Sequence, residues 1–492
     1  MIHRPGGTDI IEANHSSGVA EQSVLHDRGI SVLPHGSRPA SIRRVKNIPG
    51  RLVTLGSLAI LAGCASAPKD AGFSSVQSTV SERSGLRVEA AATDSSQAFV
   101  KASLTKPLSA DDAVQIALLR NPSLQASFDE LGIARGDLIT AGTLVNPVLE
   151  GRVRWAQHTE GTNPELTLWF DLTDMVHHGK RKGAARAQLD AAVLRAGHAA
   201  LSLAADVRRA YFDLQAASQT YRMQSQVNEA AGAQAELSRR QRSAGNINAL
   251  DLAVEESAML EARLALDHSR VDERLARQEL ARLLVLDAAD STWSVAAELP
   301  PLPASDPSAT DLESLALSGR LDVQASKKEI EASQRELSYK KSFWIPSLAV
   351  GADAERAFDG EWAYGPAVQL SLPIFDRGQG GKAAAQAGVK RAEHGAAALE
   401  SDVRQEVRSS SERMRAARDA AILYRDQIIP TREKVVAESQ KHYNFMLVGA
   451  TNLLQAKRDE IAAYRGYIEA VRDYWIARTE LERAVAAPLE TK

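Results

Sequence analysis

Residues 183–216 read GAARAQLDAAVLRAGHAALSLAADVRRAYFDLQA, and the expected fold follows from the pattern of these residues. Its apolar side chains recur every three or four residues, at Leu189, Val193, Ala196, Ala200, Leu203, Val207, Tyr211 and Leu214. That period predicts one helix with a single packed seam. No proline lies between Pro164 and Pro300. A continuous helix from about Gly179 to Arg242 would be roughly 95 Å long, far longer than a helix of an ordinary globular domain.

A second helical run extends from Lys382 to about Met446, and Pro430 predicts a kink in it. The two runs belong to an internal duplication, which is the main organisational signal of the chain. Segments 117–127 and 316–326 are similar at an offset of 199 residues. A later match, at an offset of 204, pairs Gly245, Asn248 and Leu250 with Gly449, Asn452 and Leu454.

The duplication sets the expected domain boundaries. We expect an N-terminal extension with a signal peptide (1–63), a lipid-anchored linker (64–107), a first repeat (108–298), a Pro-rich linker (299–309), a second repeat (310–486) and a C-terminal tail (487–492). Each repeat would consist of a helix, two strands and two very long helices.

Four segments between the helices have a period of two, at about 147–155, 165–173, 347–355 and 364–372. One face of each is apolar, and the other carries Glu150, Arg152, Arg154, Thr167, Asp171, Asp353, Glu355 and Gln369. Strands of about nine residues are long enough to cross a membrane at a tilt. Aromatic residues near their ends resemble an interfacial girdle, namely Trp155, Trp169, Trp344, Trp362 and Tyr364.

Two interpretations of these strands remain open. They can form soluble hairpins over a small core, or their apolar face can contact lipid. The sequence offers that face no other partner, which favours lipid. Since four strands cannot close a barrel and open edges are not tolerated in hydrocarbon, copies of the chain must pool their strands.

Three copies would supply twelve strands, and each long helix would need neighbours on both sides of its seam. The expected fold class is therefore an α+β membrane protein, a trimeric channel-tunnel whose 12-stranded β-barrel, with four strands per chain, continues into a long α-helical barrel. The polar strand faces would line its water-filled lumen.

The single cysteine, Cys64, excludes an internal disulfide and a cysteine metal cage within one chain. Arg43, Arg44, Lys46 and Arg51 precede an apolar run from Leu52 to Ala62, which is the pattern of a signal peptide. Leu61-Ala62-Gly63-Cys64 resembles the bacterial lipobox, in which the cysteine sulfur receives a diacylglyceryl group. We therefore expect a lipoprotein, with the lipid on Cys64 and no other cofactor. The absence of Asp at Ala65 resembles the pattern of lipoproteins sent to the outer membrane.

Charge and motifs exclude other classes of protein. The chain has 59 Lys and Arg against 62 Asp and Glu, so its net charge of -3 gives no sign of a nucleic-acid surface. Gly378-Gln379-Gly380-Gly381-Lys382 has the wrong spacing for a phosphate loop, and Ala383 stands where Ser or Thr is required. His177 and His178 are adjacent in a segment expected to be extended, so their side chains would point opposite ways and serve as surface polar groups. No enzymatic activity and no metal site are predicted.

The chain resembles the outer-membrane factor family whose best-known member is TolC, over residues from about Leu108 to Val485. The resemblance rests on segment 108–122, Asn146-Pro147, Leu372-Pro373-Ile374-Phe375 and the paired Gly245 and Gly449 turns. It implies a homotrimer in the outer membrane of a Gram-negative bacterium, with its helical barrel in the periplasm. Its partners would be a membrane-fusion adaptor and an inner-membrane pump of the resistance-nodulation-division type.

By that resemblance the two helix turns, 244–248 and 448–452, are the periplasmic tips that contact the adaptor and gate the channel. The residues assigned to this site are Gly245, Asn246, Asn248, Asp251, Gly449, Thr451, Asn452 and Gln455. Both glycines are expected to have positive φ as helix C-caps. Carboxylates that narrow the pore in the family usually follow the second tip, but here Asp459 and Glu460 arrive late.

The expected function is the exit duct of a tripartite efflux system that passively conducts substrate to the exterior. Gly179-Lys180-Arg181 resembles the heavy-metal branch typified by CzcC, which favours metal cations as cargo. A drug-type efflux duct or a type I protein-secretion channel of the same fold is the alternative, and a soluble periplasmic coiled-coil scaffold is a further one.

Overall fold

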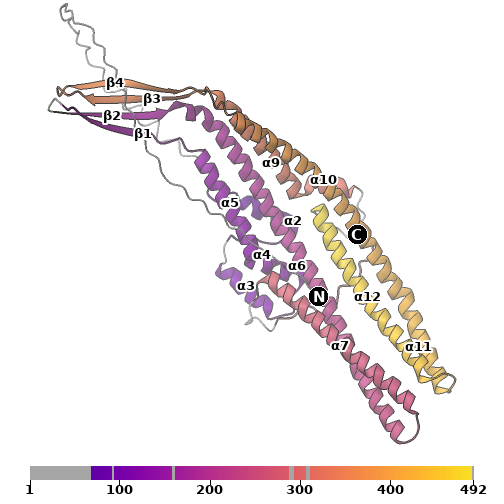
Figure 1. Cartoon of the computed structure of the whole chain (residues 1–492). Helices are drawn as coiled ribbons and strands as arrows, with labels where there is room; N and C mark the ends of the chain where they lie inside the picture. Colours follow the sequence, from indigo (N-terminus) through magenta and orange to yellow (C-terminus); the bar gives the residue numbers. More distant parts are fainter. Residues whose placement is uncertain (1–67, 91–92, 158–160, 287–292, 306–310, 490–492) are drawn as a thin grey trace, which may run out of the picture. The chain divides into compact units, whose positions relative to one another are not determined.

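The computed structural model describes residues 68–90, 93–157, 161–286, 293–305 and 311–489, which all lie within one unit, Ala62–Lys492. These residues form long helices and one antiparallel sheet (Figure 1). Cys64, the signal peptide and the N-terminal extension lie outside the described residues, as do positions 490–492 of the C-terminal tail.

The two halves contain matching elements in the same order. The first half comprises α2 (Phe73–Ser84), α3 (Asp94–Leu104), α4 (Ala110–Arg120), α5 (Pro122–Ala141), β1 (Val148–Trp155), β2 (Thr162–Asp171), α6 (Leu172–Ser243) and α7 (Ala249–Leu284). The second half comprises α8 (Leu312–Gly319), α9 (Leu321–Lys340), η3 (Lys341–Trp344), β3 (Ser347–Arg356), β4 (Trp362–Ser371), α10 (Gln379–Leu423), η4 (Tyr424–Ile428), α11 (Ile429–Asn444) and α12 (Ala450–Val485).

The duplication is visible in the element boundaries. Helix α9 starts and ends 199 residues after α5, and α12 starts and ends 201 residues after α7. The residues that end α7 and α12, Val285 and Ala486, even share a left-handed conformation, with φ of 54° and 55°. The backbone therefore repeats closely although few side chains do.

Helix α6 is longer than the sequence predicts. It runs for 72 residues, about 108 Å at about 1.5 Å per residue, and it begins at Leu172 instead of near Gly179. The side chain of Asp171 caps it, since its carboxylate accepts hydrogen bonds from the backbone N–H groups of Thr173 at 2.8 Å and Asp174 at 3.2 Å. The strand before it is correspondingly shifted, and it contains Pro164.

The second long helix is interrupted where a kink was predicted. Five residues of π-helix, Tyr424–Ile428, separate α10 from α11, and Pro430 follows in the first turn of α11. Proline has no N–H to donate and its ring crowds the preceding turn, so the wider π turn accommodates it without ending the helix.

The sheet has the order β1-β2-β3-β4, with every neighbouring pair antiparallel. Strands β2 and β3 join the two halves of the chain. The register pairs Glu150 with Thr167 and Thr167 with Asp353, so these polar residues share one face. The same alternation puts all eight residues predicted to line the lumen on that face.

Buried charges link α6, α8, α9, α10 and α12. The guanidinium of Arg320, a residue only 6% exposed at the α8–α9 junction, donates to Asp322 at 2.7 Å and to Glu406 at 2.6 Å. Arg483 also donates to Glu406, at 2.6 Å, and His198 lies 4.0 Å from Asp322. Burial raises the pKa of Asp322, but the hydrogen bonds and charge of Arg320 outweigh burial and hold this pKa below its ordinary value.

We predict that Arg320→Met lowers the stability of the folded chain by about 1.5–3 kcal/mol, because it removes charge-assisted hydrogen bonds and leaves the half-buried Asp322 without its main cationic partner. The control is Arg408→Met, which removes the exposed ion pair between Arg408 and Glu313 and should cost about 1 kcal/mol or less. Thermal unfolding of the two purified variants measures the difference. Equal losses in both would show that the buried network adds no special stability.

Candidate channel-forming surfaces

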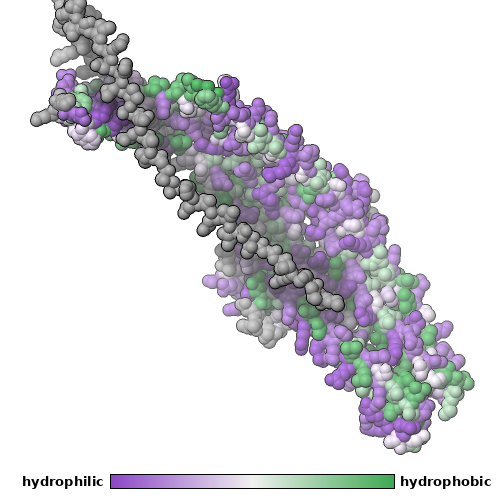
Figure 2. Space-filling model, in the orientation of Figure 1, coloured by the Kyte–Doolittle hydropathy of each residue, from purple (hydrophilic) through white to green (hydrophobic). Residues whose placement is uncertain are grey.

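The apolar face of the sheet has no cover within the described part of the chain. Val368 is 68% exposed and Tyr364 is 76% exposed. Most of the other large apolar side chains of this face are also exposed, and only Leu348 and Val350 are half-buried. The exposed ones are Leu149, Val153, Trp155, Leu166, Leu168, Phe170, Trp362 and Leu370. Figure 2 shows apolar side chains gathered over β3 and β4. The hairpins therefore do not enclose a core within one chain, and that interpretation is wrong for the chain by itself.

The polar face carries a ladder of ion pairs across β1 and β2. Glu165 accepts from Arg154 at 2.5 Å and from Arg152 at 3.4 Å, and Arg152 also donates to Glu150 at 3.1 Å. The ladder reaches the second half through Arg154, whose guanidinium lies 3.8 Å from Glu355. Charge on this face is thus largely balanced between neighbouring strands.

Hydrogen bonds extend the ladder across the junction between the halves. Thr167 donates to Asp353 at 2.7 Å, and Asn163 donates to Glu355 at 2.9 Å. Neither Asn163 nor Glu165 was among the residues predicted for the lumen. Alternation along β2 puts Glu165 on this face with Thr167, whereas Asn163 precedes the predicted strand and is placed there by the observed start of β2 at Thr162.

Trp169 corrects the predicted aromatic girdle, because it lies on the polar face. Its indole N–H donates to Glu150 at 3.2 Å, and its ring packs over Gly351. A Cβ at Gly351 would lie 2.9 Å from that ring and 2.9 Å from the carbonyl oxygen of Leu168, so only glycine fits there. Two other predicted lumen residues lie outside the ladder. Asp171 caps α6, and Gln369 is exposed on β4.

The first helix turn has the predicted conformation. Gly245 has a φ of 79°, and the N–H of Asn246 returns to the carbonyl of Gln241 at 2.8 Å, which closes the end of α6. Asn248 then caps α7, with its side-chain oxygen accepting from the N–H of Asp251 at 2.8 Å. Each of these residues therefore has a structural role in the turn.

The second turn corrects the prediction for Gly449. Its φ is -79°, and it stands at the N-cap of α12, whereas the residue with positive φ is Met446, at 57°. The N–H of Leu447 returns to His442 at 2.8 Å, as Asn246 does in the first turn. The two turns thus match at an offset of 201 residues instead of 204, because the sequence match aligned Gly449 with the wrong position of the turn.

The second turn is also strongly apolar. Met446 is 94% exposed, and Phe445 and Leu447 beside it are exposed as well. Figure 2 shows this apolar cluster at the end of the α11–α12 hairpin. Asn452 lines a groove of about 350 Å³ next to it, together with Glu438 and His442, while Thr451 is exposed on the first turn of α12.

The carboxylates near the turns are held by partners. Asp459 accepts from Arg432 of α11 at 2.9 Å and from Gln455 at 2.8 Å, so its charge is tied to the α11–α12 packing. On α7, Glu255 is only slightly exposed, and burial raises its pKa above the ordinary value. An acidic ring at the level of either residue would therefore have a reduced effective charge.

The two adjacent histidines lie within α6 and not in an extended segment. His177 shares a hydrogen bond of 2.9 Å with the hydroxyl of Ser342 and packs edge-on against Tyr339 and Phe343. Its place is thus in an aromatic cluster rather than on an open polar surface. Across the described ranges, no group of three His, Cys, Asp or Glu side chains has the arrangement of a metal site. Nor does any described helix have the length and apolarity needed to span a bilayer.

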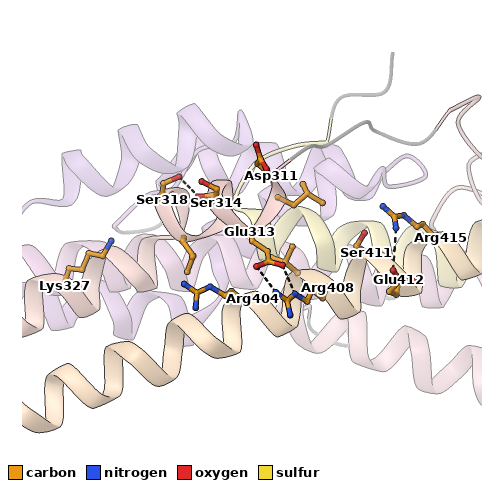
Figure 3. Close-up of a pocket in the computed structure, with 13 residues that line it drawn as sticks. Asp311, Glu313, Ser314, Ser318, Lys327, Arg404, Arg408, Ser411, Glu412 and Arg415 are labelled. Atoms are coloured by element: carbon orange, nitrogen blue, oxygen red, sulfur yellow. Dashed lines mark hydrogen bonds and ion pairs between the residues drawn. The ribbon is translucent and has the colours of Figure 1, made fainter.

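A groove of about 880 Å³ lies between α8 and α10 (Figure 3). Arg408 donates to Glu313 at 2.6 Å within it, and Arg415 pairs with Glu412 at 3.5 Å. Arg404 and Lys327 also line the groove. Because its charges pair largely among themselves, the groove has no convergent polar set that would define a ligand.

Together these surfaces define a class of protein: a chain of long helices that carries one amphipathic sheet with an uncovered apolar face. Comparison with known proteins agrees. No model of a protein family matches the chain. It is 23% identical to the cobalt-zinc-cadmium resistance protein CzcC of Cupriavidus metallidurans over 389 residues, which are 77% of the chain and 90% of CzcC.

Two further similarities differ in extent. The chain is 31% identical to the fusaric acid resistance protein FusA of Burkholderia cepacia over 254 residues, which cover 48% of the chain and 44% of FusA. Its fold matches the CmeC outer-membrane channel of Campylobacter jejuni with a TM-score of 0.69, at 14% identity, over 78% of the chain and 86% of CmeC. The resemblance to TolC-like outer-membrane channels is confirmed, and the chain has their fold. CmeC is named as an outer-membrane channel, and the chain is not an enzyme.

We predict that Glu165→Gln increases the anion selectivity of channels formed by this protein in planar bilayers. The change leaves Arg154 without its closest carboxylate and Arg152 with one partner fewer, so the polar face gains net positive charge. The reversal potential in a salt gradient measures the effect. Glu361→Gln, in the β3–β4 loop, is the charge-matched control. An unchanged reversal potential in Glu165→Gln would show that this face does not line the conducting path.

Proposed function

We propose that this protein is the outer-membrane exit duct of a tripartite efflux system, through which substrate passes passively to the exterior. The observation that carries the proposal is the four-stranded sheet, with one face uncovered and apolar and the other lined by an ion-pair ladder. A sheet with this division suits the wall of a barrel between lipid and water. The similarity to CzcC and the shared fold with CmeC support it.

The functional unit is a homotrimer with a 12-stranded barrel. Within the described chain, β1 and β4 each pair on one side only, so two rows of backbone N–H and C=O groups have no strand partner. Hydrocarbon does not tolerate such edges, and pairing β4 of one copy with β1 of the next removes them. Three copies of four strands then close one barrel, continuous with a barrel formed by the long helices.

The helix turns contact a periplasmic adaptor, which links the duct to an inner-membrane pump of the resistance-nodulation-division type. The exposed apolar residues Phe445, Met446 and Leu447 support this assignment, because an uncovered apolar cluster at a helix turn suits a protein partner. Gly245, Asn248, Gly449 and Asn452 belong to the same pair of turns, and Asp251 and Gln455 follow them.

Heavy-metal cations are the proposed cargo. The name of CzcC refers to resistance to cobalt, zinc and cadmium, and the similarity extends over nine tenths of that protein. FusA is named for resistance to an organic acid, fusaric acid, and the similarity covers less than half of it. Organic efflux of the drug type is therefore the second candidate, and type I protein secretion shares the architecture without a supporting similarity.

Growth of a strain deleted for this gene tests the cargo. We expect greater sensitivity to cobalt, zinc or cadmium salts, restored by the wild-type gene, with unchanged tolerance of dyes, bile salts and antibiotics. The physical reason is that a closed exit leaves the pumped cation inside the envelope. Broad sensitivity to organic compounds with normal metal tolerance would contradict the metal assignment and establish the drug-type alternative.

Lipidation at Cys64 is proposed as a second membrane attachment beside the barrel. We predict that Cys64→Ser abolishes incorporation of labelled palmitate, while the protein stays in the outer-membrane fraction. A single lipid-bearing residue contributes only a weak anchor compared with a closed barrel. Ala65→Ser is the control and should retain the label. Persistent labelling of Cys64→Ser would place the lipid elsewhere or disprove lipidation at this residue.

A further inference from the structure

A group of basic residues lies where the strands of the sheet end and the long helices begin. Register pairs Ser347 with Ser371 and Asp171 with Ala349, so the helix-side ends of β2, β3 and β4 lie at one level. The segments just beyond that level carry Lys180, Lys182, Lys340, Lys341, Arg377 and Lys382. We call these six residues the basic collar.

Packing contacts bring the three segments of the basic collar together. The hydrogen bond between His177 and Ser342 holds the first turns of α6 against η3. A Cβ built at Gly378 would lie 2.9 Å from the Cβ of Phe343, and one built at Gly381 would lie 3.7 Å from the Lys340 side chain. The start of α10 therefore packs against the end of α9, which places Lys382 beside Lys340 and Lys341.

Most of this charge is not neutralised by the protein. Within the described ranges, Lys340 pairs with Glu336 at 3.5 Å, but Lys341, Arg377 and Lys382 have no carboxylate within ion-pair distance. Lys180 and Lys182 likewise form no ion pair with a described residue. The arginines on the polar face of the sheet are different, since both are paired with Glu165. Unpaired cations in one zone indicate an anionic partner outside the chain.

Exposed apolar side chains accompany the basic collar. Trp344 is 67% exposed and Phe375 is 92% exposed, and Ile374 between the collar and β4 is also uncovered. Lys340 itself extends over aromatic rings, with its ammonium 5.1 Å from the centre of Phe343. Aromatic and aliphatic groups beside unpaired ammonium groups match the boundary between acyl chains and headgroups.

At the other end of the strands, the described residues include no such group of unpaired basic residues. Strand β3 ends there at Arg356, whose guanidinium donates to the carbonyl of Gly360 at 3.3 Å, and the β3–β4 loop contains Asp359 and Glu361. This loop therefore has an excess of negative charge. The two ends of the strands therefore differ in charge. In a membrane, the leaflet on the helix side would meet unpaired basic residues and the outer leaflet would not.

We propose that the basic collar binds the phosphate groups of anionic phospholipids in the leaflet that faces the helices. The proposal rests on the proposed function, because it requires the apolar face of the sheet to lie in a membrane. Charge complementarity and the adjoining aromatic side chains commit it to a lipid surface and not to a soluble anion. Bound lipid would fix the height of the sheet relative to the bilayer.

Quenching of Trp344 fluorescence by brominated lipids tests the proposal on the full-length protein. The protein is reconstituted into phosphatidylcholine vesicles that contain either brominated phosphatidylglycerol or brominated phosphatidylcholine, each at the same mole fraction. The signal of Trp344 is the difference between the parent chain and Trp344→Phe. We expect phosphatidylglycerol to quench Trp344 about threefold more effectively than phosphatidylcholine at low salt, with the preference falling as salt is added.

The decisive variant combines Lys341→Gln, Arg377→Gln and Lys382→Gln. In this variant the two brominated lipids should quench Trp344 equally, a ratio of about one. The matched control also removes three exposed cations that form no ion pair with a described residue. Its substitutions are Lys101→Gln on α3 and Arg263→Gln and Arg274→Gln on α7, helices that lie away from the sheet (Figure 1). The control should keep the threefold preference. Equal loss in both variants would show a general charge effect and overturn the proposal.

Other outcomes separate this inference from the proposed function. Channels that conduct while Trp344 shows no lipid preference would overturn the basic collar alone. Protein that fails to insert, with Trp344 unquenched by either lipid, would contradict both. Loss of the preference in inorganic phosphate, but not in chloride of equal ionic strength, would show that a soluble anion occupies the basic collar and would also overturn the lipid assignment.

Discussion

Backbone hydrogen bonding at the two outer edges of the sheet is the constraint on which the rest of this molecule depends. Inside one chain β1 and β4 each have a single neighbour, and the apolar face between them has no cover in the described residues. Water can satisfy such edges, but hydrocarbon cannot. An apolar face and open edges are compatible only if identical chains complete the sheet, so the strands make assembly a condition for membrane insertion.

The long helices depend on the same assembly. Each half supplies one pair, α6 with α7 and α10–α11 with α12, and each pair buries a seam of alanines and leucines while its other faces stay polar. The π turn before Pro430 lets the second pair bend without a break in its hydrogen bonding. Duplication thus gives both helix pairs the same backbone arrangement. Their side chains have diverged, so the turns at the ends of the two pairs differ in character.

Charge is arranged differently at each level of the chain. Arg320 is buried with carboxylates on two helices of the second half, and its counterpart at the same junction of the first half is Asn121, which caps α5 through its amide oxygen. On the sheet the arginines are paired across strands, and just below it the basic collar is left mostly unpaired. The first two arrangements stabilise the protein by itself, whereas the third leaves charge available to a membrane.

The class of fold could be predicted from the sequence alone. Periods of 3.6 and of 2 placed the long helices and four strands, and alternation separated the lumen residues from the apolar face, because both patterns depend only on local geometry. Alternation along β2 also puts Glu165 and Trp169 on the polar face. Length and hydropathy could not show that β2 begins early enough to include Asn163, or that β2 pairs with β3, which brings Asn163 to Glu355. Nor could they show that Met446, and not Gly449, adopts positive φ, since helix packing sets the turn. The basic collar joins residues 200 positions apart, so only tertiary structure could assemble it.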